Sequence, residues 1–424
     1  MSPPHKHVLD DLAWRGLIAH STDLDALREA TSAGSVKFYV GFDPTAPSLH
    51  LGNLVQILTA RRLQDAGHTP YALVGGATGM IGDPKDSGER SLNALDVVKE
   101  WVEKVHGQVE RFLDFEGEHP ATMVNNYDWT ASLSTIDFLR DVGKHFPVNR
   151  MLARDVVRTR LDAGISYTEF SYILLQSMDY LNLYRDYGVT LQFGGSDQWG
   201  NLTGGVELVR RVEGARVHAF ATPLVTKADG TKYGKTEGGA LWLDADMMSP
   251  YAFYQFWLNA EDEKVGELLR IFTFLTREEI EGLEVQTAEK PFLRVGQKTL
   301  ADNVTTLVHG AAEAERIKAA SAALFGGGEL AGLSTPTLAA ALREAGSVQI
   351  PRGVSLPTVV ELLVASGLSA SKGAARRTIG EGGAYLNNAR VEDPEAVPST
   401  EDLLGGSWLV LRRGKKNLAG VEVV

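Results

Sequence analysis

The segment 50–53, His-Leu-Gly-Asn, combines glycine with two side chains that can donate hydrogen bonds. It precedes a predicted helix, whose N-terminus favours anions because its first amide groups are unpaired. Gly52 would let a phosphate chain approach the backbone, while His50 and Asn53 would supply donors. Taken alone, such a tetrad is more typical of an ordinary helix start.

The segment 227–236 is polar, punctuated by glycine, and carries Lys232 and Lys235 three residues apart. A mobile basic loop of this kind can close over a departing pyrophosphate and neutralise the charge that develops on it. A solvated surface turn has the same composition, and this segment alone favours that interpretation.

A third segment, Gly-Gly-Ser-Asp-Gln-Trp-Gly-Asn at 194–201, is more specific. Its glycine pair would bring the backbone against a ligand, Asp197 could bind a ribose hydroxyl, and Gln198 offers both a donor and an acceptor. A plain strand-to-helix turn rarely needs a glycine pair, an acid, an amide and a tryptophan together. The segment therefore indicates a binding site.

Within the predicted helix 170–181, three polar residues stand four and then three positions apart and so share one face. They are Tyr172, Gln176 and Asp179. Apolar residues cover much of the remaining surface, which favours a buried pocket over a stripe that faces solvent. Buried polar groups need partners, and a ligand can provide them.

Short apolar strands at 38–42, 71–74, 123–124 and 189–193 alternate with amphipathic helices, which predicts a parallel sheet covered on both faces. Polar residues or glycines follow the C-terminal end of each strand. Open α/β sheets bind ligands at those ends, so the segments described above should meet there.

The rest of the chain predicts further domains. Helical periodicity runs from about 249 to 323, glycines at 326–328 break it, and the stretch after them, rich in small residues, indicates a linker. We expect an α/β domain at 1–247, an α-helical domain at 248–324, a linker at 325–353 and a small last module at 354–424.

The composition, with 44% hydrophobic and 23% charged residues among 424, is typical of a soluble globular protein. No run approaches the roughly eighteen apolar residues of a membrane span, and the N-terminus lacks a signal-peptide pattern. The absence of Cys suits a reducing cytosol, so a cytoplasmic protein is expected. The net charge is −12, but the segment 351–424 carries 9 basic against 8 acidic residues, and a polyanion would meet it more readily than the rest.

In this order, the three segments resemble the two signatures and the ribose loop of class I aminoacyl-tRNA synthetases. Segments 39–46, 75–79, 82–84 and 125–129 narrow the resemblance to the bacterial tyrosyl-tRNA synthetase family. The last module is similar to a small RNA-binding domain of the ribosomal S-four type. The resemblance implies a Rossmann-like α/β domain with a connective insertion, an α-helical anticodon-side domain and an α+β RNA-binding domain. It also implies a homodimer that activates L-tyrosine with ATP and transfers it to tRNA(Tyr).

The family's site residues carry over by motif position. The residues implied to bind tyrosine are Tyr39 and Asp179 at the phenol, Asp83, Tyr172 and Gln176 at the ammonium, and Asn126 and Gln198 nearby. Those implied to bind ATP are Gly41, Asp43, Thr45, His50, Gly52, Asn53, Gly195, Asp197, Lys232 and Lys235. The catalytic candidates are His50, Asn53, Lys232, Lys235, Thr236 and Arg90. The residues expected to contact tRNA are Lys372, Arg376, Arg377, Arg412, Arg413, Lys415 and Lys416. Mg²⁺ is expected to accompany ATP, because no dedicated carboxylate cage is evident.

The sequence departs from the family pattern at two places. Asn53 replaces the usual second histidine of the first signature, so it can donate to a phosphate but carries no charge. Tyr233-Gly234 and Thr236 replace residues of the second signature, although both lysines remain. Two alternatives stay open, a tryptophanyl enzyme of the same class and a non-catalytic RNA-binding descendant.

Overall fold

The structure is a computed structural model that describes residues 7–84, 92–236, 239–326, 328–330, 332–353, 355–414 and 417–424. Its contacts divide the chain into two compact units. The first comprises Met1–Met247 and Glu261–Pro291, and the second comprises Met248–Ala260 and Phe292–Val424. No helix in these ranges is long and apolar enough to span a membrane.

The first unit is built on a sheet with the strand order β1-β6-β5-β2-β3-β4. The strands are β1 (His20–Ser21), β2 (Lys37–Phe42), β3 (Thr69–Val74), β4 (Thr122–Asn125), β5 (Leu191–Gly195) and β6 (His218–Thr222). All neighbours run parallel except β1, which is antiparallel to β6. The predicted α/β class and the four predicted strands are therefore confirmed. Strand β6 was not predicted, because it is fully buried and shows no alternation of apolar and polar residues.

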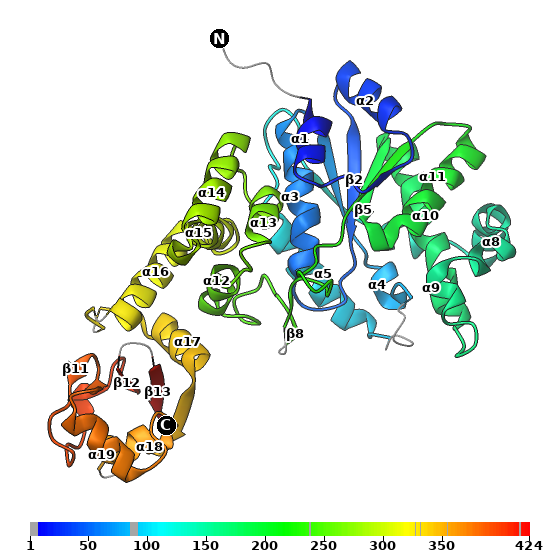
Figure 1. The fold of residues 1–424 in the computed structure, drawn as a ribbon. Helices are drawn as coiled ribbons and strands as arrows, with labels where there is room; N and C mark the ends of the chain where they lie inside the picture. Colours follow the sequence, from blue (N-terminus) through cyan, green and yellow to red (C-terminus); the bar gives the residue numbers. More distant parts are fainter. Residues whose placement is uncertain are drawn as a thin grey trace. The chain divides into compact units, whose positions relative to one another are not determined.

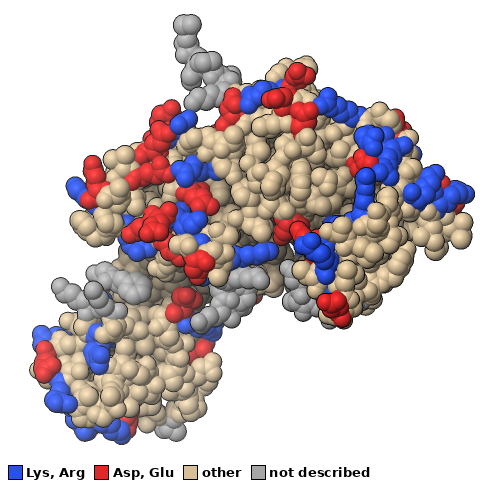
Figure 2. Space-filling model, turned by 45° about the vertical axis from the view of Figure 1, so that its right-hand side comes forward, with Lys and Arg blue, Asp and Glu red and all other residues tan. Residues whose placement is uncertain are grey.

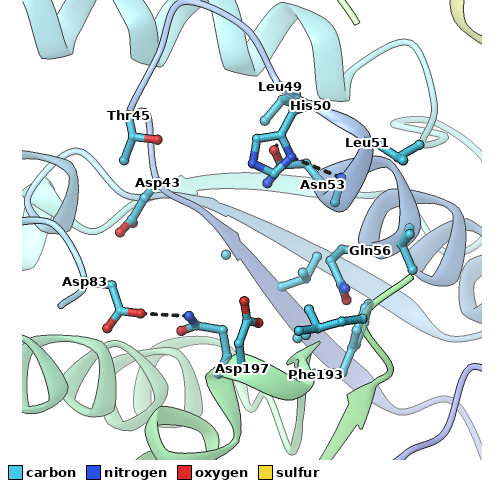
Figure 3. Close-up of a pocket in the computed structure, with 18 of the residues that line it drawn as sticks. Asp43, Thr45, Leu49, His50, Leu51, Asn53, Gln56, Asp83, Phe193 and Asp197 are labelled. Carbon is cyan, nitrogen blue, oxygen red and sulfur yellow. Dashed lines mark hydrogen bonds between the residues drawn. The ribbon is translucent and has the colours of Figure 1, made fainter. Parts of the chain in front are cut away.

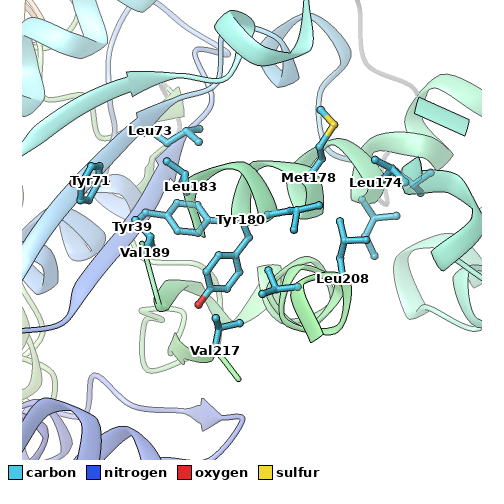
Figure 4. Close-up of a cluster of buried hydrophobic side chains, with 14 of the residues drawn as sticks. Tyr39, Tyr71, Leu73, Leu174, Met178, Tyr180, Leu183, Val189, Leu208 and Val217 are labelled. Atoms are coloured by element: carbon cyan, nitrogen blue, oxygen red, sulfur yellow. The ribbon is translucent and has the colours of Figure 1, made fainter. Parts of the chain in front are cut away.

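Helices cover both faces of this sheet. In Figure 1, α3 (Leu51–Asp65) lies on one side of β2 and β5, while α10 (Tyr167–Tyr187) and α11 (Trp199–Glu213) lie on the other. The core beneath α10 is shown in Figure 4, where the ring of Tyr39 packs edge-on against that of Tyr180 at 5.2 Å, with Leu183 and Val189 nearby. Tyr39 thereby links the central strand to the polar helix.

The remaining elements of the first unit are shorter or lie at its periphery. They are α1 (Val8–Trp14), α2 (Leu24–Ala33), α4 (Thr78–Ile81), α5 (Leu95–Val109), α6 (Tyr127–Thr130), α7 (Thr135–Asp137), α8 (Val148–Leu152), α9 (Asp155–Arg158), α13 (Val265–Phe272), α14 (Arg277–Glu289) and the two-stranded ribbon of β7 (Lys235–Thr236) and β8 (Gly239–Ala240). The segment between β4 and α10 contains α6, α7, α8 and α9 and is called the connective insertion below. The predicted helical stretch after 249 is helical, but α13 and α14 belong to the first unit.

The second unit contains a helical part and a small α+β part. Its helices are α12 (Pro250–Leu258), α15 (Val295–His309), α16 (Ala311–Gly326), α17 (Thr335–Ala345), α18 (Val359–Ala365) and α19 (Lys372–Gly380). Its strands are β9 (Ser347–Ile350), β10 (Ala384–Leu386), β11 (Ala389–Arg390), β12 (Trp408–Arg413) and β13 (Asn417–Val423), in the order β11-β10-β12-β13-β9. The helices α18 and α19 and the strands β10, β11, β12 and β13 lie within the segment 354–424, where the sequence predicts a small last module.

The segment 325–353 differs from the expected linker, because it contains α17 and β9. Ser334 caps α17 by accepting the amide of Thr337, and a proline follows in the first turn. β9 pairs in parallel with β13 and completes the small sheet. The small residues that suggested a linker instead form α17, which packs closely on that sheet.

Because α17 packs closely on β13, we expect alanine to destabilise the protein at Gly420 but not at Gly373. A Cβ at Gly420 of β13 would lie 2.7 Å from Cβ of Leu342 and 3.1 Å from the ring of Trp408. We expect Gly420→Ala to lower the free energy of unfolding by about 1–3 kcal/mol, the usual cost of overpacking. In the control Gly373→Ala, the new methyl would meet only Ser371 Oγ at 3.9 Å. That variant should be neutral or stabilised by up to about 1 kcal/mol. Urea unfolding followed by fluorescence would test both, and an unchanged Gly420→Ala midpoint would contradict this packing.

Candidate active site

A cavity of about 420 Å³ opens at the C-terminal ends of β2 and β5, beside the N-terminus of α3. In Figure 3, His50 and Asn53 lie above, and Asp83 and Asp197 lie below. Most of the residues that the resemblance assigns to tyrosine and ATP line this one cavity, as expected for the ends of parallel strands.

His50 and Asn53 form a capping box at the start of α3. Nδ1 of His50 accepts the amide of Gly52 at 3.0 Å, and Oδ1 of Asn53 accepts the amide of His50 at 3.1 Å. Burial lowers the pKa of His50, so its ring is neutral at pH 7 and the proton resides on Nε2. The cap thus fixes both side chains while leaving the Nε2 proton of His50 and the Nδ2 group of Asn53 as donors to an anion.

The ribose-loop acid and the first lysine of the basic loop lie on the same side of the cavity. Asp197 Oδ2 is 3.5 Å from Lys232 Nζ, and both side chains are about half exposed. Such a pair contributes little stability and separates easily. A Cβ at Gly195 would lie 2.6 Å from Asp197 Oδ1, so glycine leaves the room in which the carboxylate sits.

The basic loop is anchored on α3 through its backbone. The amide of Leu241 donates to Gly234, and the amide of Leu51 donates to Leu241. Gly234 has a φ of 82°, and a Cβ there would lie 2.6 Å from the Leu51 side chain. Only glycine fits this position. The side chains of Lys235 and Thr236 and all of Arg90 lie outside the described residues.

Asp179 forms the closed end of the cavity. Its side chain is 2% exposed, and its oxygens accept Nδ2 of Asn126 at 3.0 Å and Nε1 of Trp129 at 2.9 Å. Burial raises the pKa of Asp179 to about 7, while these two hydrogen bonds oppose the rise. The carboxylate is therefore held by fixed donors and stays partly ionised near neutrality.

Four buried acceptor or hydroxyl groups on the cavity wall have no hydrogen-bond partner among the described residues. They are Oη of Tyr39 and the Oε1 atoms of Gln56, Gln176 and Gln192. Gln192 was not predicted from the sequence, although an amide within the apolar strand β5 was a usable signal. Unpaired polar groups on the wall of a cavity are satisfied when a polar ligand fills it.

Tyr172 and Asp43, which the resemblance assigns to different substrates, are bonded to each other. Tyr172 Oη donates to Asp43 Oδ2 at 2.6 Å, and Thr78 Oγ1 donates to Asp43 Oδ1 at 2.6 Å. The hydroxyl of Tyr172 is therefore engaged with Asp43 in this structure.

Asp83 is held by two amides of the ribose-loop segment. Its oxygens accept Gln198 Nε2 at 2.8 Å and Asn201 Nδ2 at 3.1 Å. Arg154 of the connective insertion donates in turn to Asn201 Oδ1 at 2.6 Å. Arg154 carried no sequence signal, because the contact joins segments 47 residues apart.

Of the remaining predicted residues of this site, some line the cavity and one holds a residue that lines it. Gly41, Thr45 and Gly52 line the cavity. Asn126 is fully buried and hydrogen-bonds two residues of the cavity wall, Asp179 and Thr78. In this structure it supports the Asp179 carboxylate, and its direct contact with tyrosine stays a prediction.

The residues expected to contact tRNA lie in the second unit. Lys372 and Arg376 are exposed and paired with Glu361 and Glu395, and Arg377 and Arg413 are exposed as well. Figure 2 shows basic side chains along the lower edge of this module.

Arg412, by contrast, is 9% exposed and lies over the ring of Tyr385 at 5.1 Å. Its Nη1 donates to the carbonyl of Leu324 at 3.5 Å, so the guanidinium lies against the end of α16 and is largely covered. Lys415 and Lys416 lie outside the described residues.

Comparison with known proteins decides the family. Residues 31–326 match the model of the class I tRNA synthetases (W and Y). The chain belongs to this family. Residues 339–421 match the tyrosine–tRNA ligase SYY-like C-terminal domain, which begins within α17 and so agrees with the structured segment described above.

Several relatives resemble this synthetase along its whole length. A tyrosine–tRNA ligase of Streptomyces coelicolor is 62% identical over 98% of this chain and 99% of its own, and one of Acidothermus cellulolyticus is 60% identical over 98% and 99%. A C-terminally truncated mitochondrial tyrosyl-tRNA synthetase of Aspergillus nidulans superposes with a TM-score of 0.68 at 30% identity, covering 76% of this chain and 95% of that one.

Proposed function

We propose that this synthetase is a tyrosine–tRNA ligase, which activates L-tyrosine with ATP and transfers it to the 3′ end of tRNA(Tyr). The observation that carries the proposal is the closed end of the cavity, where the unpaired hydroxyl of Tyr39 lines the same cavity as the carboxylate of Asp179. A phenol is both donor and acceptor, so it can satisfy both groups at once.

The same geometry argues against the two alternatives. An indole N–H only donates, so tryptophan could not accept the proton of the buried Tyr39 hydroxyl, which would stay unpaired. A purely RNA-binding descendant would need neither the capped donors of His50 and Asn53 nor the Asp197–Lys232 pair on the cavity wall.

In the first reaction, an oxygen of the tyrosine carboxylate attacks the α-phosphorus of ATP as the bond to pyrophosphate breaks. The carboxylate is already ionised at neutral pH, so no general base is needed and catalysis depends on alignment and charge stabilisation. Nε2 of His50 and Nδ2 of Asn53 donate to phosphate oxygens at the N-terminus of α3, and Lys232, Lys235, Thr236 and Arg90 are proposed to stabilise the leaving pyrophosphate. The ATP arrives with Mg²⁺ bound to its phosphates.

In the second reaction, a hydroxyl of the terminal ribose of the tRNA attacks the carbonyl carbon of the adenylate and releases AMP. We propose that the exposed basic residues Lys372, Arg376, Arg377 and Arg413 bind the tRNA, together with Lys415 and Lys416. Arg412 is left out of this surface because it is buried. The absence of Cys and the nature of the substrates suit a cytoplasmic enzyme.

We also propose a homodimer that forms through the connective insertion. Large apolar side chains are exposed along this segment and at the start of α10, namely Ile136, Leu139, Val148, Leu152, Leu161 and Tyr167. Exposed apolar surface concentrated in one segment is typical of an interface between protein chains.

The first prediction tests the proposed substrate by pyrophosphate exchange with tyrosine and phenylalanine. Wild-type protein should exchange with tyrosine and reject phenylalanine, because a site built around a hydroxyl leaves buried groups unpaired when the hydroxyl is missing, an effect for which tyrosyl-tRNA synthetases are the standard example. Tyr39→Phe should lower kcat/KM for tyrosine by about 0.5–1.5 kcal/mol, the worth of one neutral hydrogen bond. Asp179→Ala should lower kcat/KM for tyrosine further, because it removes a charged acceptor.

The control for this prediction is phenylalanine, which has no hydroxyl to lose and should be affected much less. Equal losses for both amino acids in Tyr39→Phe would mean that Tyr39 does not contact the hydroxyl. Exchange with tryptophan in place of tyrosine would overturn the proposed function.

A second prediction separates the two reactions. Replacement of Lys372, Arg376 and Arg377 by alanine should leave exchange unchanged while raising KM for tRNA, and the salt dependence of tRNA binding should weaken by roughly one unit of slope per lost phosphate contact. Arg316→Ala, an exposed arginine of α16 paired with Glu313, is the matched control. Normal charging by the triple variant would remove these residues from the tRNA surface.

A third prediction concerns assembly. Ile136→Glu combined with Val148→Glu places charges on the proposed interface and should convert the dimer to a monomer in analytical ultracentrifugation. Val285→Glu, on the similarly exposed Val285 of α14, should leave the dimer intact. A monomeric wild-type protein, or a double variant that remains dimeric, would contradict this interface.

A further inference from the structure

Two carboxylates of the cavity, Asp179 at its closed end and Asp43 on the ATP side, are joined by a chain of hydrogen bonds that passes through Thr78. Asn126 Nδ2 donates to Asp179 Oδ2 at 3.0 Å and to Thr78 Oγ1 at 2.9 Å. Thr78 Oγ1 donates in turn to Asp43 Oδ1 at 2.6 Å. Thr78 is 2% exposed, and this chain links elements that follow three different strands.

The direction of each bond in this chain is determined by chemistry. An ionised carboxylate only accepts, so the single proton of the Thr78 hydroxyl is committed to Asp43. The hydroxyl must then accept from Asn126, whose amide presents N–H groups to both Thr78 and Asp179. Oδ1 of Asn126 accepts the amide of Ala77 at 2.7 Å, which excludes the flipped orientation.

The local backbone leaves room for this chain of bonds. A Cβ at Gly75 would lie 2.0 Å from Asp43 Oδ1 and 2.3 Å from Thr78 Oγ1, so it would clash with both hydrogen-bonded atoms. The turn after β3 therefore carries glycine where the Asp43–Thr78 bond crosses it. In this way the backbone of the turn accommodates that bond.

We propose that Thr78 is a positioning residue that holds the phenol-recognising carboxylate and the ATP-side carboxylate in one fixed arrangement. Its hydroxyl orients Asn126, which keeps a donor on Asp179, and it simultaneously orients Asp43, which also accepts Tyr172 Oη at 2.6 Å. Selection of tyrosine and alignment of ATP thereby share one hydroxyl group. This inference rests on the proposed tyrosine–tRNA ligase activity.

The test compares Thr78→Val, which keeps the branched shape and removes the hydroxyl, with Thr78→Ser, which retains the hydroxyl. Thr78→Val should raise KM for tyrosine and for ATP, and lower kcat/KM for tyrosine roughly 3- to 10-fold, the range of one buried hydrogen bond. The value of kcat/KM for phenylalanine should fall less, so the ratio of kcat/KM for tyrosine to that for phenylalanine should decrease. Thr78→Ser should restore the ratio.

Two controls separate positioning from a general structural effect. Thr59→Val removes another buried hydroxyl, one that bonds only to the carbonyl of Val55 in its own helix, and should leave the ratio unchanged. In an Asn126→Ala background, adding Thr78→Val should no longer change the ratio, because the link to Asp179 is already broken. If Thr78→Val does not fold, Thr78→Ala removes the same hydroxyl without placing a second methyl against Asp43.

The outcomes distinguish this inference from the function on which it rests. Wild-type protein without tyrosine-dependent exchange would overturn the proposed function and the inference together. Wild-type exchange with an unchanged ratio in Thr78→Val, equal losses for both amino acids, or failure of Thr78→Ser to restore the ratio would each overturn the role of Thr78 alone.

Discussion

The cavity depends on one constraint, the burial of the Asp179 carboxylate away from water. An ionised group in such a place is costly unless fixed donors compensate it. Asn126 and Trp129 supply those donors, and both follow β4, a strand at the far edge of the sheet from β6. The sheet order therefore brings an acid from α10 and two donors from the turn after β4 to one point. The proposed recognition of the tyrosine phenol by Asp179 depends on that meeting.

The N-terminus of α3 is the proposed binding site for the phosphates of ATP, where His50 and Asn53 would act as neutral hydrogen-bond donors. The N-terminus of α3 offers its helix dipole, and the capping box holds His50 and Asn53 with their remaining donors available. Burial keeps His50 neutral, so it acts as a hydrogen-bond donor and not as a cation. The side-chain oxygen of Asn53 accepts the backbone amide of His50 and so caps the helix, while its side-chain nitrogen can donate to the proposed ligand.

The second unit obtains its stability by other means. Its small sheet is completed by β9, and α17 packs on β13 where Gly420 leaves space for Leu342. Apolar side chains, among them Leu409 and Leu411 of β12, fill the core on one face of the sheet, and Arg412 lies on the other face. The basic residues Lys372, Arg376 and Arg377 of α19 stay exposed, which supports their proposed role in binding tRNA.

The amino-acid sequence alone was sufficient to predict the fold class, four of the parallel strands, the polar face of α10 and the meeting of the glycine-rich segments at one edge of the sheet. These features follow from local periodicity and from the rule that parallel strands share their C-terminal edge. The strand β6 was missed because it is fully buried and shows no alternation of apolar and polar residues. The helix α17 was missed because its small residues resembled a linker, although Ser334 and the proline in its first turn were usable signals of a helix start. The folded chain was needed to show that Asn126 supports Asp179, that Tyr172 is bonded to Asp43, that Arg412 is buried and that Arg154 reaches Asn201. Each of these contacts joins segments distant in the sequence, and hydrogen-bond partners at that separation are set by three-dimensional packing and not by spacing along the chain.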